Sequence, residues 1–479
     1  MTVDLVKQNY IDFLLTIEKE SSLYSQNSSF GIKKNLGQFF TDASVAKFMA
    51  EMFSCSLPRT NKVSILDCGA GHGILAIALL SRLVLEGYNS IELTLYEIDD
   101  LALGKLNENL IEFSLKYPYL DFSYTIKNSN FILDNIKEKF DYIVSNPPYF
   151  KVNKNSNEAL SMSHVVHGQP NIYMLFMAKS SELLKRDGEM VFITPRSFTS
   201  GSYFKKFREY MLDNLSLVQI HIFNSRREQF KNETILQETI ITKFKKNSSQ
   251  KVVISSSEDS HFFKVNTINV TKDMIVEKSR AMIGIPTSKE ELTLLKRFNS
   301  AVYRFKDMGY KISTGKVVTF RAKEFIRRDI KNITNDKEYV PLLWMQNFKQ
   351  EKLVFPLNSN KEQYIQHIDK TKKLLIPNSN YIVIKRFSSK EQYRRVNIGH
   401  IFKESLSSDY LGLENHLNYL YREDRELTRD EMKELALFLT SKEVDQYFRI
   451  FNGNTQVNAT DILMLPVPDK LYKGKMCQG

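Results

Sequence analysis

Short apolar runs alternate with longer segments in which apolar residues recur every three or four positions over the first half of the chain. A short apolar run bounded by turn residues is typical of a buried strand, and the longer period is typical of a helix that buries one face. The sequence therefore predicts a doubly wound α/β domain, with its ligand site at the carboxyl ends of the strands. The predicted strands are 63–67, 91–97, 122–126, 140–145, 188–194, 216–224 and 234–244, and the predicted helices are 73–86, 100–115, 171–186 and 203–213.

Other segments frame this core. Two helices, Val3 to Leu23 and Ala43 to Phe53, are expected ahead of it, with Thr41 or Asp42 as an N-cap signal. The polar segment 151–168 is too long for a simple connection, which predicts a mobile flap over the site. The expected domains are an N-terminal helical segment (1–60), a catalytic core (61–250), a linker region (251–284) and a second, mixed α+β domain (285–479).

Composition argues for a globular protein with a polyanionic partner and against a membrane-spanning or disulfide-rich one. The 479 residues suffice for two or three domains, and the formal net charge of +12 suggests a polyanionic partner. No run of 18 apolar residues argues for a membrane span, and the first ten residues do not read as a signal peptide. The three cysteines are too few and too scattered for a disulfide framework, and His164 and His167 lack a third ligand, so no metal site is expected. A reducing cytoplasm is the natural compartment.

A glycine-rich loop follows the first predicted core strand. Asp67 stands two positions before Gly69-x-Gly71-x-Gly73, a spacing that departs from the G-x-G-x-x-G of dinucleotide sites. Such glycines let the backbone approach a ligand and free the amides at a helix N-terminus. An aspartate here suits the cationic amino group of a methionine moiety, and Glu97, at the end of the next strand, suits two ribose hydroxyls. The pattern favours S-adenosylmethionine.

The tetrapeptide Asn146-Pro147-Pro148-Tyr149 directly follows a predicted strand. A conjugated amino nitrogen is a poor nucleophile because its lone pair is delocalised. The side-chain carbonyl of Asn146 and the backbone carbonyl of Pro147, in a segment with two fixed φ angles, can each accept one N–H bond and aim the lone pair at a methyl group. Tyr149 offers a face on which an extruded base can stack. A strand that ends in a proline turn is the alternative interpretation, but the tetrapeptide predicts methylation of a base amino group or a glutamine amide.

These motifs together resemble a known family. The order Gly37-Gln38-Phe39-Phe40-Thr41, glycine loop, Glu97, Asn-Pro-Pro-Tyr and long C-terminal region is similar to that of the gamma-type, TaqI-like adenine-N6 DNA methyltransferases of type II restriction–modification systems. The specific motifs cover about residues 30–245, and the overall organisation is similar to that of the PstI and BsuBI group, which acts on CTGCAG. The resemblance implies a class I, Rossmann-like core, S-adenosylmethionine as cofactor, and a flipped adenine in double-stranded DNA as substrate.

The resemblance also implies residue roles. Where the family usually has an aspartate beside the cofactor's adenine, this chain has Asn130, whose preference depends on which way its amide faces. The second aromatic wall of the target pocket aligns with Phe230, although a plain loop aromatic remains the alternative. The implied cofactor-binding residues are Phe40, Thr41, Asp67, Gly69, Gly71, Glu97, Asn130 and Asn146, and the implied catalytic residues are Asn146, Pro147, Pro148 and Tyr149.

Basic residues are mixed with aromatic ones in the second half of the chain, over 311–331 and 372–404. This mixture suits a surface that follows DNA phosphates, although a charge run is often only a solvated face. Lys385, Arg386, Arg394 and Arg395 are the expected substrate contacts, with Tyr149 and Phe230 at the base. No nuclease constellation is evident, so the cognate restriction endonuclease is expected to be a separate protein, and the methylase a monomer. An RNA base methyltransferase and a protein-glutamine methyltransferase remain alternatives.

Overall fold

A computed structural model describes residues 3–27, 41–224, 238–330, 338–388, 391–453 and 455–467. The chain divides into two compact units, Met1–Lys289 and Glu290–Gly479. Each unit has its own sheets and its own apolar core. In the described part of the chain, no helix is long and apolar enough to cross a membrane.

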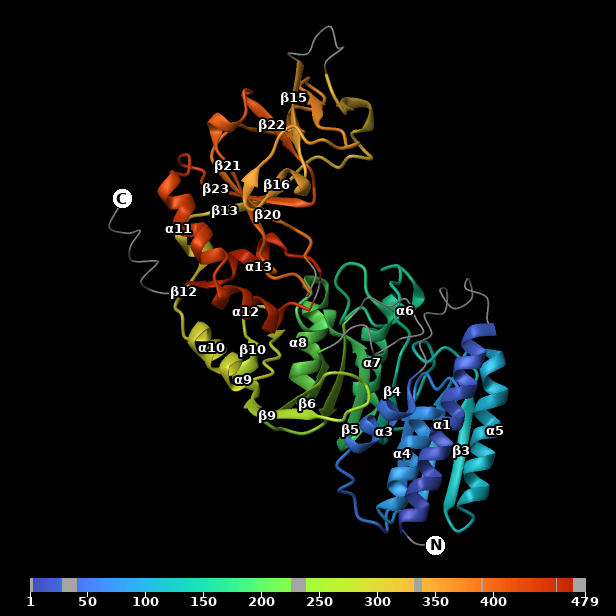
Figure 1. Ribbon diagram of the computed structural model, residues 1–479. Helices are drawn as coiled ribbons and strands as arrows, with labels where there is room; N and C mark the ends of the chain where they lie inside the picture. The colour runs from blue at the N-terminus through green and yellow to red at the C-terminus, as the bar shows by residue number, and fades with distance from the viewer. Residues whose placement is uncertain are drawn as a thin grey trace. The chain divides into compact units, whose positions relative to one another are not determined.

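Unit 1 is built on a nine-stranded sheet with the order β3-β2-β1-β4-β5-β7-β6-β8-β9 (Figure 1). Strands β1 to β5 run parallel to one another, whereas β7 runs antiparallel to both β5 and β6. This is the doubly wound sheet that the apolar pattern predicts. The strands are β1 (Val63–Asp67), β2 (Ser90–Tyr96), β3 (Asp121–Lys127), β4 (Phe140–Ser145), β5 (Leu184–Pro195), β6 (Ser216–Phe223), β7 (Thr239–Lys245), β8 (Lys251–Ser257) and β9 (Val265–Thr271).

Helices cover this sheet because its strands are apolar on both faces. Ile65 and Val144 pack in one core with residues of α1, α3, α4 and α5, while their neighbours Leu66 and Ile143 are equally buried toward the opposite face. Helix α7 packs against β5 and α8 (Figure 1). The helices are α1 (Val3–Asn27), α3 (Ala43–Glu51), α4 (Ile74–Leu85), α5 (Asp100–Lys116), α6 (Asn157–Ser161), α7 (Ile172–Leu183), α8 (Lys205–Asn214) and α9 (Lys272–Ile275), with a small ribbon of β10 (Val276–Glu277) and β11 (Met282–Ile283) after them.

Three predicted elements differ from the structure. Residues 251–271, expected to be part of a linker, form β8 and β9 and extend the central sheet. The helix predicted over 171–186 ends at Leu183, because Leu184 already pairs with Phe140 of β4. The segment 151–168 is not structureless: Ser156 caps the short helix α6, and the bridge between Lys151 and Asn171 joins the two ends of the segment.

Unit 2 contains two principal sheets, β13-β23-β20-β21 and β14-β18-β15-β22-β19. One apolar cluster takes side chains from both sheets, such as Val383 of β20 and Leu411 of β22, and a second cluster lies on the five-stranded sheet. The strands are β12 (Tyr303–Arg304), β13 (Lys311–Thr314), β14 (Ile326–Arg327), β15 (Tyr339–Leu343), β16 (Phe348–Lys349), β17 (Lys352–Leu353), β18 (Tyr364–Gln366), β19 (Leu375–Pro377), β20 (Tyr381–Lys385), β21 (Ile398–Ile401), β22 (Tyr410–Leu413), β23 (Leu417–Tyr421) and β24 (Pro466–Val467), and the helices are α10 (Lys289–Asn299), α11 (Arg429–Leu439), α12 (Lys442–Phe451) and α13 (Ala459–Leu463).

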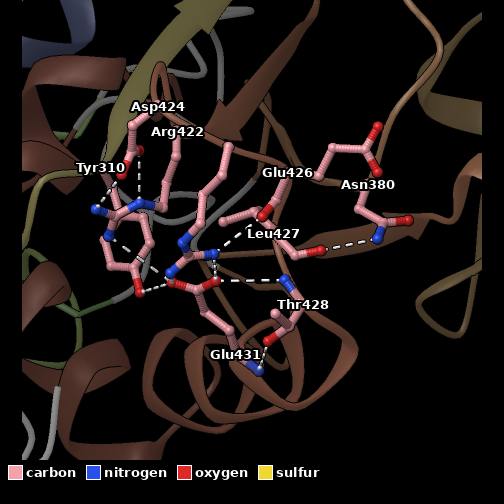
Figure 2. A network of polar contacts seen from close by, with 9 residues as sticks. Tyr310, Asn380, Arg422, Asp424, Glu426, Leu427, Thr428 and Glu431 are labelled. Atoms are coloured by element: carbon pink, nitrogen blue, oxygen red, sulfur yellow. Dashed lines mark hydrogen bonds and ion pairs between the residues drawn. The ribbon is translucent and has the colours of Figure 1, made fainter. Parts of the chain in front are cut away.

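A buried carboxylate fixes the start of α11 (Figure 2). Glu431 is only 8% exposed, and it accepts hydrogen bonds from the Tyr310 hydroxyl (2.7 Å) and from both terminal nitrogens of Arg425 (2.8 and 3.2 Å). Thr428 completes a capping box, in which its hydroxyl accepts from the Glu431 amide and its own amide donates back. The network ties α11 to Tyr310, directly ahead of β13, and satisfies a charge that burial would otherwise penalise.

Candidate active site

The glycine loop after β1 has a backbone that only glycine adopts easily. Gly71 and Gly73 have φ of +53° and +86°, in the left-handed region. A Cβ at Gly73 would lie 2.7 Å from Cδ1 of Leu106 on α5, so the loop packs directly against its neighbour. The loop leads into α4, with Gly73 at its N-cap position.

Asp67, the last residue of β1, is fully buried. Its Oδ1 accepts a hydrogen bond from the Gly69 amide at 3.3 Å, whereas Oδ2 has no hydrogen-bond partner in the described part of the chain. Burial raises the pKa of this carboxyl to about 7, because desolvation penalises the charged form. A buried acceptor without a partner is costly, so Asp67 fits a cationic group supplied by a ligand.

Glu97 follows β2 and holds the loop to that strand. One of its carboxylate oxygens accepts from the Gly71 amide at 2.7 Å, and the other accepts from the amides of Ile98 and Asp99, both at 2.8 Å. Burial raises its pKa, and these three amides act in the opposite direction. The contact with Gly71 places Glu97 beside the glycine loop, as the sequence pattern predicts, while its bond to ribose stays a prediction.

A cavity of about 300 Å³ joins these residues to the tetrapeptide. Thr41, Gly69, Gly71, Glu97, Asn130 and Asn146 line it, which brings together six of the eight predicted cofactor-binding residues. Asp67 lies one position before the lining residue Cys68, and Phe40 falls outside the described residues. Pro148, predicted as part of the catalytic tetrapeptide, also lines the cavity. Sequence reasoning assigned no site role to the rest of the lining, which consists of Cys68, Ala70, His72, Leu75, Tyr96, Ile98, Ala102, Ser129, Phe131, Phe150, Val152, Glu158, Ile172 and Phe176.

Asn146 directly follows β4, and its amide is held from both sides. Its Nδ2 donates to the Thr41 hydroxyl at 3.1 Å, and the Tyr149 hydroxyl lies 2.6 Å from its Oδ1. The same tyrosine hydroxyl is 2.9 Å from the carbonyl oxygen of Ile193, on β5. Sequence reasoning placed Tyr149 among the catalytic residues and gave its ring a base-stacking role, with no role for its hydroxyl. The structure adds a positioning contact, because the hydroxyl sets which way the Asn146 carbonyl faces.

The proline residues complete this turn. Pro147 is buried and Pro148 lines the cavity, so the segment passes along the cavity wall. The ring of Tyr149 is partly exposed and meets Tyr173 edge-on, with ring centroids 6.1 Å apart. Phe230, the expected second aromatic wall, lies outside the described residues. The stacking role of Tyr149 stays a prediction.

The four basic residues predicted to contact DNA have different environments in unit 2. Lys385 donates to the carbonyl of Phe348 at 2.8 Å, and burial lowers its pKa. Arg386 donates to the carbonyl of Asn415 at 2.6 Å. Arg394 is partly exposed and lies 3.2 Å from Glu351. These three side chains each have a protein partner, and their contact with DNA stays a prediction.

The prediction for Arg395 is wrong. Its side chain is 1% exposed, and its guanidinium donates to Ser388 and to the carbonyl of Asn452, both at 3.1 Å. Its backbone amide also donates to Asp445, on α12. Alternating basic and aromatic residues do not reveal which arginine faces inward, and here the guanidinium links the chain to the end of α12.

Comparison with known proteins decides the family. Residues 75–230 match the family model described as Eco57I restriction-modification methylase. The chain is 36% identical to the type II methyltransferase M.BsuBI of Bacillus subtilis over 451 residues, which cover 91% of this chain and 88% of that protein. It is 33% identical to the type II methyltransferase M.PstI of Providencia stuartii, over 92% of this chain and 88% of that protein. The chain belongs to the type II methyltransferase family.

The structure of this methyltransferase agrees with that membership. The type IIL restriction-modification enzyme MmeI, solved in complex with DNA, aligns with a TM-score of 0.62 and 14% identity over 95% of this chain and 72% of that chain. At this identity the likeness establishes the fold alone, which is a class I methyltransferase core with further sheets and helices. S-adenosylmethionine is the cofactor, and the glycine loop together with Oδ2 of Asp67, which has no partner in the described part of the chain, fits its methionine end. Among the described residues, no cluster of three or more His, Cys, Asp or Glu is arranged to hold a metal ion.

Proposed function

We propose that this type II methyltransferase methylates the N6 amino group of an adenine flipped out of duplex DNA. We further propose that it is the modification enzyme of a restriction–modification system, that the endonuclease is a separate protein, and that the methyltransferase acts as a monomer. The observation that carries the proposal is the position of Asn146: it directly follows β4 and lines the same cavity as Gly69, Gly71 and Glu97.

The residues around that cavity suit the chemistry. S-adenosylmethionine supplies an activated methyl group, and the protein has to make a conjugated nitrogen nucleophilic. The Asn146 carbonyl, oriented by the Tyr149 hydroxyl, and the Pro147 carbonyl accept the two N–H bonds of the target. These acceptors are held in place before the reaction, so little reorganisation opposes the transition state. Methylation of this kind uses no nucleophilic side chain.

Two other acceptors have the same chemistry, a base in RNA and the amide of a protein glutamine. The likeness to M.BsuBI and M.PstI extends over more than 90% of the chain, and therefore includes unit 2 as well as the catalytic core. That extent favours DNA. Lys385, Arg386 and Arg394 are the residues of unit 2 that we propose to contact phosphates, since all three side chains are basic and none is fully buried.

The experiment incubates the full-length protein and radiolabelled S-adenosylmethionine with different methyl acceptors and compares how much label each acceptor takes up. Duplexes with CTGCAG, the sequence that the resemblance suggests, and with a scrambled site are tested beside a structured RNA and a glutamine peptide. Mass spectrometry of the digested product then distinguishes N6-methyladenine from N4-methylcytosine. We expect label in duplex DNA as N6-methyladenine, and none with Asn146→Ala. Label in RNA or peptide only, or in cytosine, contradicts the proposal.

Sequencing of methylated adenines identifies the recognition site without assuming it. DNA from cells that express the parent is compared with DNA from cells that express Asn146→Ala, and a motif methylated only with the parent is the target. A motif other than CTGCAG corrects the recognition sequence but leaves the reaction as proposed. Methylation that is equal in both cultures counts against the assignment of Asn146.

A further inference from the structure

The order of the strands determines which way round a cofactor would lie in the cavity. Neighbouring strands run β3-β2-β1-β4, and their carboxyl ends meet at the cavity. The tetrapeptide follows β4, the glycine loop follows β1, Glu97 follows β2, and Ser129, Asn130 and Phe131 come after β3. A cofactor with its methyl group at β4 and its ribose at β2 therefore places its adenine at the β3 end.

Asn130 is poorly oriented to recognise that adenine. Its Oδ1 accepts from the backbone amide of Ile132 at 3.0 Å, within its own turn. Its Nδ2 donates to Oε1 of Glu158 at 3.0 Å. The amide therefore turns its carbonyl to its own backbone and its donor to the glutamate. The exocyclic amino group of adenine is itself a donor and requires an acceptor, which this orientation of Asn130 does not offer.

Glu158 offers that acceptor. It lies on α6, it lines the cavity, and it is partly exposed. The Asn130 bond occupies one of about four acceptor positions of the carboxylate. In the described part of the chain, no cation forms an ion pair with Glu158.

We propose that Glu158 selects the adenine of S-adenosylmethionine by accepting a hydrogen bond from its exocyclic amino group, with Asn130 as the residue that positions the carboxylate. The proposal rests on the assignment of this cavity to the cofactor. The resemblance implies that an aspartate in the loop after β3 accepts this hydrogen bond. In our proposal the acceptor instead lies on α6, in the segment 151–168.

The surrounding structure supports this role. The ends of that segment are joined close to the tetrapeptide, where Val152 donates to the carbonyl of Pro170 and Ile172 donates to the carbonyl of Phe150, both at 2.9 Å. Phe150, Val152 and Ile172 also line the cavity. The segment that carries Glu158 is therefore part of the cavity wall, and α6 is held near the β3 end by the bond to Asn130.

Calorimetric binding of two ligands to the full-length protein tests the proposal. S-adenosylhomocysteine carries the amino group, and S-inosylhomocysteine carries a carbonyl oxygen in its place, which the carboxylate of Glu158 would repel. A hydrogen bond to a charged acceptor corresponds to roughly a 10- to 100-fold change in affinity. We expect Glu158→Ala to bind S-adenosylhomocysteine about 10- to 100-fold more weakly, and S-inosylhomocysteine as well as the parent does or better. Glu158→Gln loses the charge but keeps a carbonyl acceptor, so its loss should be smaller.

The deciding quantity is the ratio of the two affinities, which does not depend on the fraction of folded protein. A ratio that falls toward one in Glu158→Ala supports the role of Glu158. A ratio that stays at the parental value, or an equal loss for both ligands, overturns it and leaves Glu158 a structural residue of α6. The control is Glu112→Gln on α5, which removes an exposed carboxylate and should leave both affinities unchanged. If the parent itself binds neither ligand, the assignment of the cavity fails instead.

Discussion

Cofactor binding should strengthen as the pH rises from about 6 to about 8, because Asp67 has to be ionised to receive a cationic amino group. Burial raises the pKa of this carboxyl to about 7 in the cofactor-free protein. At lower pH the carboxyl is protonated, and binding must first release that proton. At higher pH the carboxylate is already present, so no such cost arises.

The magnitude follows from that pKa. Below it, the ionised fraction falls about tenfold for each pH unit, so affinity should drop roughly tenfold between pH 8 and pH 6. Binding at pH 6 should release close to one proton, and binding at pH 8 about a tenth of one. His72 also lines the cavity, and burial lowers its pKa, which reduces its own titration over this range.

Calorimetry with S-adenosylhomocysteine measures both quantities. Titrations at pH 6, 7 and 8 in two buffers of different ionisation enthalpy give the affinity and the number of protons released. Asp67→Asn should bind weakly at every pH and show neither the pH dependence nor the proton release, whereas Glu112→Gln should behave like the parent. An affinity that does not change with pH in the parent, without proton release, refutes the proposed pairing of Asp67 with the amino group.

Ionisation of Asp67 lowers the stability of the cofactor-free protein as the pH rises, whereas it strengthens cofactor binding. The unfolded Asp67 has a pKa near 3.8, and the folded one has a pKa of about 7, so its contribution to the free energy of unfolding is fully present below pH 4 and is lost as the pH rises to 7. Asp67→Asn removes the ionisation. In the absence of cofactor, thermal melts should therefore show a larger gain in stability for Asp67→Asn over the parent at pH 8 than at pH 5.

Three further predictions concern catalysis and DNA. Asn146→Ala should reduce single-turnover methylation by a factor on the order of 100 or more while S-adenosylhomocysteine affinity stays within about a few-fold, and unchanged methylation would contradict its role as acceptor. Tyr149→Phe keeps the ring but loses the hydroxyl that orients Asn146. Turnover should therefore fall by roughly 3- to 10-fold with DNA affinity unchanged. A loss of turnover as large as that of Asn146→Ala would show that the hydroxyl takes a direct part in the chemistry. Arg394→Gln should flatten the slope of log DNA affinity against log salt concentration by about 0.9. Arg395→Gln should mainly lower the melting temperature, because Arg395 is buried. Equal slopes for Arg394→Gln and the parent would rule out a phosphate contact by Arg394.

The local signals in the sequence were sufficient for the core fold. Apolar runs at β1, β2 and β4, each ending in a polar residue or a turn, predicted strands whose ends meet. The linker prediction was wrong over 251–271, because the serines of β8 are typical of solvated loops. In the sheet, Ser255 and Ser257 lie 2.9 and 3.1 Å from the two ring nitrogens of His221 on β6, so their hydroxyls are satisfied while buried. Only the pairing of strands supplies that partner.

The sequence by itself determined the chemistry of this protein, because glycine spacing, paired prolines and the order of motifs are local properties of the chain. The tertiary structure decided which side chains meet. Thr41 and Asn146 are 105 positions apart, Asn130 and Glu158 are 28 apart, and Arg395 turns inward to the carbonyl of Asn452. Contacts of this kind depend on the order of strands in a sheet and on how loops close over it, and neither is encoded in the few residues around each position.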